Sequence, residues 1–251
     1  MRNIYLICFI AVILLSCFSC RPKDDMDIFL LIGQSNMAGR AEIREQDRDS
    51  LEMVFLFTND PIHPWEHAAN PLNKYSTIRK KITMQKLGPG YSFARTLSDH
   101  FPKQKFGLIV NAKGGTSIRE WLPGTKNYQE ALSRTISAMH YGTLRGILWY
   151  QGSSDTKRVE QYLAELELVI NSFRADLEME NLPFIACELS NAKPERADFN
   201  RMLADLPQQV RNTAIIEAAE LQTFDSTHFN SESQTIIGER YAREMIKFLE
   251  K

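Results

Sequence analysis

Cysteine is scarce in this sequence, and three of its four cysteines lie within the first twenty residues. Only Cys187 remains beyond them, so the body of the protein cannot form an intramolecular disulfide and must be held by a packed core. Cys187 ends an apolar run, which favours a buried thiol over a nucleophile. No cysteine and histidine spacing is typical of a zinc site, and we predict neither a metal nor another cofactor.

An excess of charge is also missing. The 30 Lys and Arg residues balance 31 Asp and Glu residues, for a formal net charge of −1. This balance gives no electrostatic reason to expect a nucleic-acid partner. There is no internal repeat or low-complexity run, and 43% of the 251 residues are hydrophobic. The composition therefore predicts a globular protein, and the length suits one large domain or at most two small ones.

A single long apolar run is present, from Ile4 to Leu15 after the basic Arg2. It is too short to span a bilayer comfortably, which takes about 20 residues. Cysteines and small residues follow it, and a polar segment begins at Arg21. The pattern resembles a bacterial lipoprotein signal, in which a cysteine becomes the lipidated first residue. Cys20 is the expected lipidation site and Cys17 the alternative; an ordinary secretory signal is the competing interpretation.

We therefore divide the chain into a signal peptide over residues 1–19, a short polar tether over 20–26 and one folded domain over 27–251. The mature protein is expected to be exported and held at the cell envelope. Its one expected contact with a membrane is the lipid anchor.

Short apolar runs alternate with longer segments of helical periodicity beyond the leader. The predicted strands are Ile28–Ile32, Val54–Thr58, Phe106–Val110, Gly146–Tyr150, Phe184–Cys187 and Thr213–Ile216. The predicted helices are Tyr91–His100, Asn127–Tyr141, Val159–Met179, Asp198–Val210 and Ser231–Leu249. Apolar strands separated by helices predict an α/β fold with a parallel sheet covered on both faces. Ligands of such sheets bind beyond the carboxyl ends of the strands.

Residues 59–90 break this alternation, because they are rich in proline and glycine and show no sustained period. Long irregular segments in compact domains are often functional. We expect this segment to run over the surface and to form a wall of the binding cleft.

The first predicted strand leads to Gly33, Gln34 and Ser35 at the point where a helix would begin. A serine there has an exposed hydroxyl next to free backbone amides, which stabilise a developing negative charge. The alternative is that Ser35 only caps the helix.

Two further strand ends carry polar or flexible residues. Gly114 and Gly115 allow backbone amides to approach a ligand closely, as an oxyanion hole requires, although a glycine pair also marks ordinary turns. Gln151 directly follows an apolar strand, where its amide is a candidate donor to an oxyanion; capping of backbone is the alternative.

Asp225 and His228 lie three residues apart before the last predicted helix. In a turn, this spacing lets the carboxylate accept from one ring nitrogen while the other nitrogen faces a nucleophile. His63 and His67 are four apart, but the prolines around them argue against a helical pair of metal ligands.

Five blocks of the chain are similar, in the same order, to blocks of one enzyme superfamily. They are Gly33–Met37, Gly88–Ala94, Lys113–Ser117, Trp149–Gly152 and Asp225–His228. The chain thus resembles the SGNH hydrolases, in their sialate O-acetylesterase and carbohydrate esterase family six (acetylxylan esterase-like) branch. The resemblance implies a three-layer α/β/α, flavodoxin-like sheet and metal-independent cleavage of acyl esters through an acyl-enzyme.

The same resemblance implies a role for each site residue. Ser35 is the expected nucleophile, His228 the general base and then acid, and Asp225 the carboxylate that orients the histidine. The oxyanion hole is expected from the Ser35 amide, an amide of Gly114 or Gly115 with Gly114 favoured, and the Gln151 side chain. The implied substrate is an acetylated carbohydrate, such as a sialic acid, xylan or another polysaccharide.

One position departs from the family pattern, because Ser153 stands where relatives often carry glutamate. Any role of that glutamate is either absent here or passes to Asp155. Trp65, Tyr91 and Trp121 are candidates to stack on sugar rings, with a place in the core as the alternative for each. Two other functions are compatible with the sequence: a lipase or thioesterase of the same superfamily, and a carbohydrate-binding protein that has lost turnover.

Overall fold

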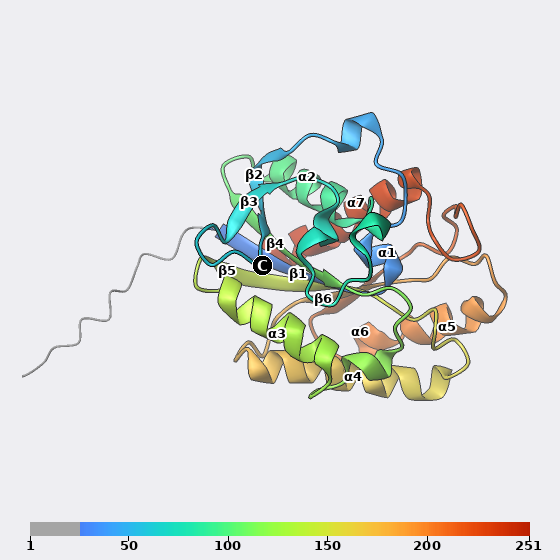
Figure 1. The fold of residues 1–251 in the computed structure, drawn as a ribbon. Coiled ribbons are helices and arrows are strands. Elements are labelled where there is room, and N and C mark those ends of the chain that lie inside the picture. The colour runs from blue at the N-terminus through green and yellow to red at the C-terminus, as the bar shows by residue number, and fades with distance from the viewer. Residues whose placement is uncertain (1–25) are drawn as a thin grey trace, which may run out of the picture.

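A computed structural model describes residues 26–251 of the chain. It contains one seven-stranded sheet in the order β3-β2-β4-β1-β5-β6-β7 (Figure 1). The strands are β1 (Met26–Gly33), β2 (Leu51–Phe57), β3 (Trp65–Ala68), β4 (Lys105–Ala112), β5 (Thr143–Tyr150), β6 (Phe184–Cys187) and β7 (Thr213–Ile216). All neighbouring strands run parallel except β2 and β3, which are antiparallel.

Helices cover both faces of the sheet. They are α1 (Ser35–Ala38), α2 (Gly90–His100), α3 (Lys126–Ala138), α4 (Val159–Asp176), α5 (Glu195–Leu203), α6 (Leu206–Gln209) and α7 (Ser231–Leu249). Helices α2 and α7 pack together on one face, and α3, α4 and α5 lie on the other (Figure 1). The predicted three-layer α/β/α fold is confirmed.

The core follows from this layering. Strand β1 lies at the centre between β4 and β5, and its residues Ile28 to Ile32 are fully buried. A strand with helices on both faces has no solvent side, which explains why its sequence is continuously apolar. Cys187 is buried at the end of β6, as predicted. Among residues 26–251, no helix is long and apolar enough to cross a membrane.

Two elements differ from the sequence-based expectation. Strand β3 lies inside the segment 59–90, where no strand was predicted; it pairs with the edge strand β2 and is only four residues long. The helix predicted over Asp198–Val210 is divided into α5 and α6, with Pro207 in the first turn of α6. A proline has no N–H to donate and clashes inside a helix, so the helix ends and restarts before it.

The residues before Met26 lie outside the described part of the chain. The signal peptide, the tether and the lipidation at Cys20 or Cys17 therefore stay predictions.

Candidate active site

Strand β1 and the short helix α1 position Ser35. Gly33 ends β1 with φ +134°, and a Cβ on it would lie 2.2 Å from the carbonyl oxygen of Tyr150 in β5. Glycine is therefore required there for the chain to turn against β5. The Gln34 N–H donates to that Tyr150 carbonyl at 2.7 Å. Ser35 follows as the first residue of α1, where the helix itself does not use its N–H.

Ser35, His228 and Asp225 are joined by hydrogen bonds, although the serine and the histidine are 193 residues apart in sequence. The His228 Nε2 lies 2.9 Å from the Ser35 Oγ, and the His228 Nδ1 lies 2.7 Å from an Asp225 carboxylate oxygen. The Ser35 side chain lies in a nearly buried position, with 7% of the residue exposed. Because a histidine held by a carboxylate on one nitrogen can accept a proton on the other, this arrangement suits activation of the serine hydroxyl.

The turn that carries Asp225 and His228 is fixed by the aspartate itself. One carboxylate oxygen accepts from the backbone N–H groups of Thr227 and His228, at 2.6 and 2.7 Å, and the other faces the imidazole. Burial acts to raise the pKa of Asp225, but the hydrogen bonds from the His228 ring and from the two backbone N–H groups outweigh it and lower the pKa. The carboxylate therefore stays charged.

Asn36 connects this turn to the serine helix. Its amide donates to the Thr227 carbonyl at 3.0 Å and accepts from the Phe229 N–H at 3.2 Å, so it bonds to both neighbours of His228. Gln234, from α7, also donates to the Asn36 side chain at 3.2 Å. Sequence reasoning treated Asn36 only as part of a motif, because a partner that lies so far along the chain leaves no local signal.

Gly114 lies directly against the serine. A Cβ on Gly114 would be 3.2 Å from the Ser35 Cβ and 2.8 Å from the Arg40 Nη2, so a larger residue would be crowded here. Within residues 26–251, neither the Ser35 N–H nor the Gly114 N–H has a hydrogen-bond partner. These two amides are the candidate donors to an oxyanion. Gly115 follows with φ +76° and is exposed.

The structure places Gln151 differently from the expectation. Its side-chain nitrogen donates to the Thr116 carbonyl at 2.8 Å and to an Asp155 carboxylate oxygen at 2.7 Å, which uses both of its hydrogens. Gln151 is fully buried and does not line the cavity at Ser35. The expected donation from Gln151 to an oxyanion is therefore corrected: its contacts brace the loop after β5.

Asp155 is buried and engaged in the same way. Besides Gln151, it accepts from the Ile118 N–H at 2.9 Å and pairs with Arg158 at 3.2 Å. None of these contacts is to His228. Asp155 therefore makes no contact through which it could assist His228, and it does not line the cavity at Ser35.

Ser153 is instead bonded to Gln34, the residue before the serine. The Gln34 side-chain nitrogen donates to the Ser153 Oγ at 2.7 Å, and the Gln34 oxygen accepts from the N–H groups of Gly152 and Ser153. Gln34 thus ties the end of β1 to the loop after β5. Sequence reasoning did not assign this role to Gln34.

A cavity of about 370 Å³ opens above Ser35, and we call it the Ser35 cavity. It is lined by Gln34, Ser35, Arg40, Lys80, Met84, Gly114, Gly115, Ser153, Ser154, Thr227 and His228. Lys80 and Met84 come from the segment 59–90, which therefore contributes a wall of the cavity as predicted.

Other candidates from the sequence lie elsewhere. Tyr91 and Trp121 are buried in the core, and Trp65 packs on Phe57 in the edge of the sheet, so none of the three faces the Ser35 cavity. His67 packs on Phe55 of β2. Among residues 26–251 there is no cluster of three metal-ligating side chains.

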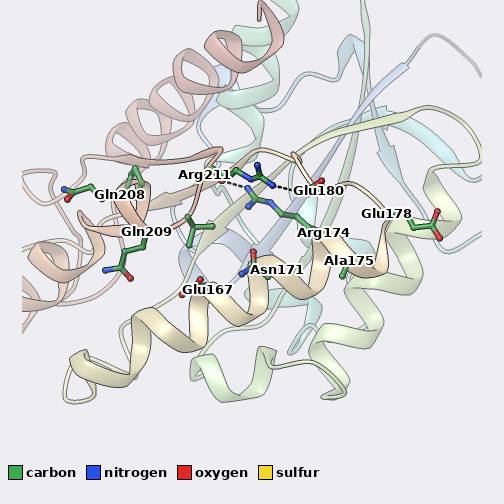
Figure 2. Close-up of a pocket in the computed structure, with 11 residues that line it drawn as sticks. Glu167, Asn171, Arg174, Ala175, Glu178, Glu180, Gln208, Gln209 and Arg211 are labelled. Carbon is green, nitrogen blue, oxygen red and sulfur yellow. Dashed lines mark hydrogen bonds and ion pairs between the residues drawn. The ribbon is translucent and has the colours of Figure 1, made fainter.

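A larger hollow, of about 740 Å³, lies between α4 and the segment before β7 (Figure 2). Arg174 is its buried charged residue, and its guanidinium donates to the carbonyls of Leu182, Arg211 and Asn212. Arg211 pairs with Glu180 at the rim (Figure 2). Because Arg211 precedes β7, this hollow is at the amino end of that strand, whereas Ser35 follows the carboxyl end of β1. Three of its charged groups, Arg174, Arg211 and Glu180, are engaged within the protein.

A serine, a histidine and an aspartate in hydrogen-bonded series, at the carboxyl edge of a mostly parallel α/β/α sheet, form the arrangement of an SGNH-type serine hydrolase. The chain belongs to the carbohydrate esterase, sialic acid-specific acetylesterase family, which it matches over residues 25–247. The protein is therefore an esterase of a carbohydrate acetylesterase family.

The chain is also similar, in sequence or in fold, to individual proteins of this kind. The chain is 27% identical to a probable carbohydrate esterase of Arabidopsis thaliana over 236 residues, which are 86% of this chain and 89% of that protein. The solved structure of the Arabidopsis protein superposes with a TM-score of 0.79 at 26% identity, over 88% of this chain and 98% of that one. NanS shares the fold, with a TM-score of 0.68 at 17% identity over 91% and 98% of the two chains. A Xanthomonas citri carbohydrate acetylesterase does so with a TM-score of 0.62 at 16% identity, over 87% and 55%.

Proposed function

We propose that this protein removes acetyl groups from a carbohydrate by an acyl-enzyme mechanism, with Ser35 as nucleophile. The observation that carries the proposal is the 2.9 Å contact between the Ser35 Oγ and the His228 Nε2, with Asp225 on the other ring nitrogen. Membership of a carbohydrate acetylesterase family supports the acetyl ester as the bond that is cleaved.

Each half of the reaction transfers one proton through His228. The Ser35 Oγ attacks the acetyl carbonyl carbon while His228 takes the hydroxyl proton. The negative oxygen that forms is stabilised by the Ser35 and Gly114 amides. The bond to the sugar oxygen then breaks, and that oxygen leaves with the proton from His228. Water repeats the sequence on acetyl-Ser35, which releases acetate and restores the serine.

Two substrate groups fit the proposal: O-acetylated sialic acids and O-acetylated polysaccharides such as xylan. The family is that of sialic acid-specific acetylesterases, and the structural neighbour from Xanthomonas citri is a carbohydrate acetylesterase. The Ser35 cavity, of about 370 Å³, has room for the acetyl group and part of one sugar.

Replacing Ser35 with alanine tests the proposal. Acetate release from acetylated sialic acids, xylan and pectin should fall to background, because no other hydroxyl that lines the Ser35 cavity is hydrogen-bonded to the His228 ring. The unfolding temperature should be unchanged, because one small hydroxyl is lost. A serine-reactive phosphonate should label the native protein at Ser35 and should not label His228→Ala.

Acetate release by purified Ser35→Ala at a rate near that of the native protein would exclude this mechanism. Rates that rise with acyl chain length would instead identify a lipase or thioesterase.

A further inference from the structure

Two cationic side chains lie over the glycine pair beside Ser35. The Arg40 Nη2 is 2.8 Å from the position that a Cβ would take on Gly114, and the Lys80 Nζ is 3.3 Å from the corresponding position on Gly115. Both side chains line the Ser35 cavity. They come from separate segments, after α1 and before the turn Ile82–Met84, so their meeting here is a product of the fold.

Neither cation is paired with a carboxylate in the described part of the chain. The Arg40 Nη1 donates to the carbonyls of Gly39 and Met84, which fixes the guanidinium, while its Nε and Nη2 have no partner among residues 26–251. Lys80 has no hydrogen bond or ion pair within the same range. Burial lowers the pKa of Arg40, as expected for a guanidinium that loses water without gaining a carboxylate.

The rest of the cavity does not compensate this charge. Its other lining residues are glycine, serine, threonine, glutamine, methionine and His228, so no carboxylate lines it. The nearby carboxylate of Asp225 is already held by the His228 ring and by two backbone N–H groups. The cavity therefore presents two positive charges to whatever enters it. A negative group on the ligand would gain charge-assisted hydrogen bonds there.

We propose that the Ser35 cavity selects acetyl esters of sugars that carry a carboxylate, and that Arg40 and Lys80 bind this carboxylate. The inference rests on the proposed function and deepens it, since it names the charge class of the substrate. Sialic acids and the uronic acids of polysaccharides both supply such a group. A neutral acetylated sugar would offer neither cation a charged partner.

Binding to Ser35→Ala separates this inference from the proposed function, because that variant holds the ester without cleaving it. The ligands are methyl glucuronoside and methyl glucoside acetylated on the same ring hydroxyl, which differ only at C6, a carboxylate in the first and a neutral hydroxymethyl group in the second. Calorimetry should give the glucuronoside a Kd about tenfold lower than that of the glucoside. This difference is at the lower end of what a hydrogen bond to a charged group contributes, because the two cations are partly exposed. The preference should shrink as sodium chloride is raised.

Single substitutions then identify which residues are responsible for the preference for the glucuronoside. Lys80→Gln should reduce the preference for the glucuronoside by about threefold to fivefold, because one of two cations is lost. Lys81→Gln is the matched control, since Lys81 is exposed like Lys80 but does not line the cavity, and it should leave the preference unchanged. Ser153→Glu places a carboxylate in the same cavity and should reduce the preference further. An O-acetylated sialic acid in the same series distinguishes the two sources of the carboxylate.

Equal Kd values for the two glycosides in Ser35→Ala would overturn the inference, even if the native protein releases acetate from both. An equal loss of kcat/KM on both substrates in Lys80→Gln would also overturn it, because the cation would then act on the reacting oxygen. Conversely, a native protein that releases acetate from none of the acetylated sialic acids, xylan, pectin and the two glycosides, while Ser35→Ala still prefers the glucuronoside, would reject the proposed function and leave the carboxylate site standing.

Discussion

At the scale of single residues, Asp225 performs two tasks with its two oxygens. One holds the backbone of the turn and the other holds the His228 ring. Asp225→Asn keeps an oxygen for the turn but can present an N–H to the ring, which favours the wrong tautomer of the histidine. We expect kcat to fall about a thousandfold or more, with little change in unfolding temperature. Steady-state kinetics and a thermal melt check both, and a variant with normal kcat would exclude the role of Asp225.

Gln151 is expected to matter for stability more than for catalysis. Its amide supplies a hydrogen to the buried Asp155 carboxylate and another to the Thr116 carbonyl. Gln151→Leu should lower the free energy of unfolding by about 1–3 kcal/mol, the cost of leaving buried acceptors without a donor. In urea titrations the native protein and the variant would show this difference directly. A variant of native stability with kcat reduced a hundredfold would restore Gln151 to the oxyanion hole.

Sequence reasoning found the three triad residues because each carries its own local signal, and the structure brings them together. Ser35 follows a strand and a glycine, and Asp225 and His228 share one turn. Arg40 and Lys80 carried no such signal, since nothing in the sequence around either residue indicates that its side chain reaches the Ser35 cavity. Gln151 was misassigned for a similar reason: its position after β5 was correct, but the direction of its amide depends on Asp155 and Thr116.

At the scale of elements, the contact between α1 and the turn before α7 decides where His228 lies. Asn36→Ala should break both hydrogen bonds to the neighbours of His228, so that the imidazole is held less well against Ser35. We expect kcat to fall about tenfold to a hundredfold and KM to change less, because misplacement of a reacting group mainly affects the transition state.

Asn200→Ala is the matched control for this prediction. Asn200 is another buried asparagine, and it bonds to the backbone of Leu189 outside the Ser35 cavity. The two variants should lose similar stability, whereas only Asn36→Ala should lose kcat. A comparable loss of kcat in both would show that Asn36 acts through general stability and not by positioning His228.

The predicted strands were largely correct, because burial on both faces of the sheet gives a continuous apolar run that sequence makes visible. The short β3 was missed since its four residues, Trp65–Ala68, pair only with the edge of β2 and have no clear alternation. The division between α5 and α6 was missed because the apolar spacing continues through Pro207. The proline itself was the signal for that break.

At the scale of the whole molecule, the anchor predicted at Cys20 decides where the esterase works. Cys20→Ala should convert a membrane-bound protein into a soluble exported one, since the lipid is its only expected contact with the membrane. Cell fractionation and immunoblotting measure this, with Cys17→Ala as the control that should remain bound. Release by Cys17→Ala alone would move the site to that cysteine, and release by neither would remove the lipoprotein interpretation.

The common direction of β1 and its parallel neighbours has a consequence for how the enzyme would face its surroundings. The described chain enters the sheet at Met26, and Ser35 lies just beyond the opposite end of the same strand. Eight residues of strand separate these points by roughly 25 Å. A domain anchored through Cys20 would thus have its point of attachment at the end of β1 opposite Ser35. The anchor itself would then not obstruct the mouth of the Ser35 cavity, and a large glycan could reach the serine while the protein stays attached.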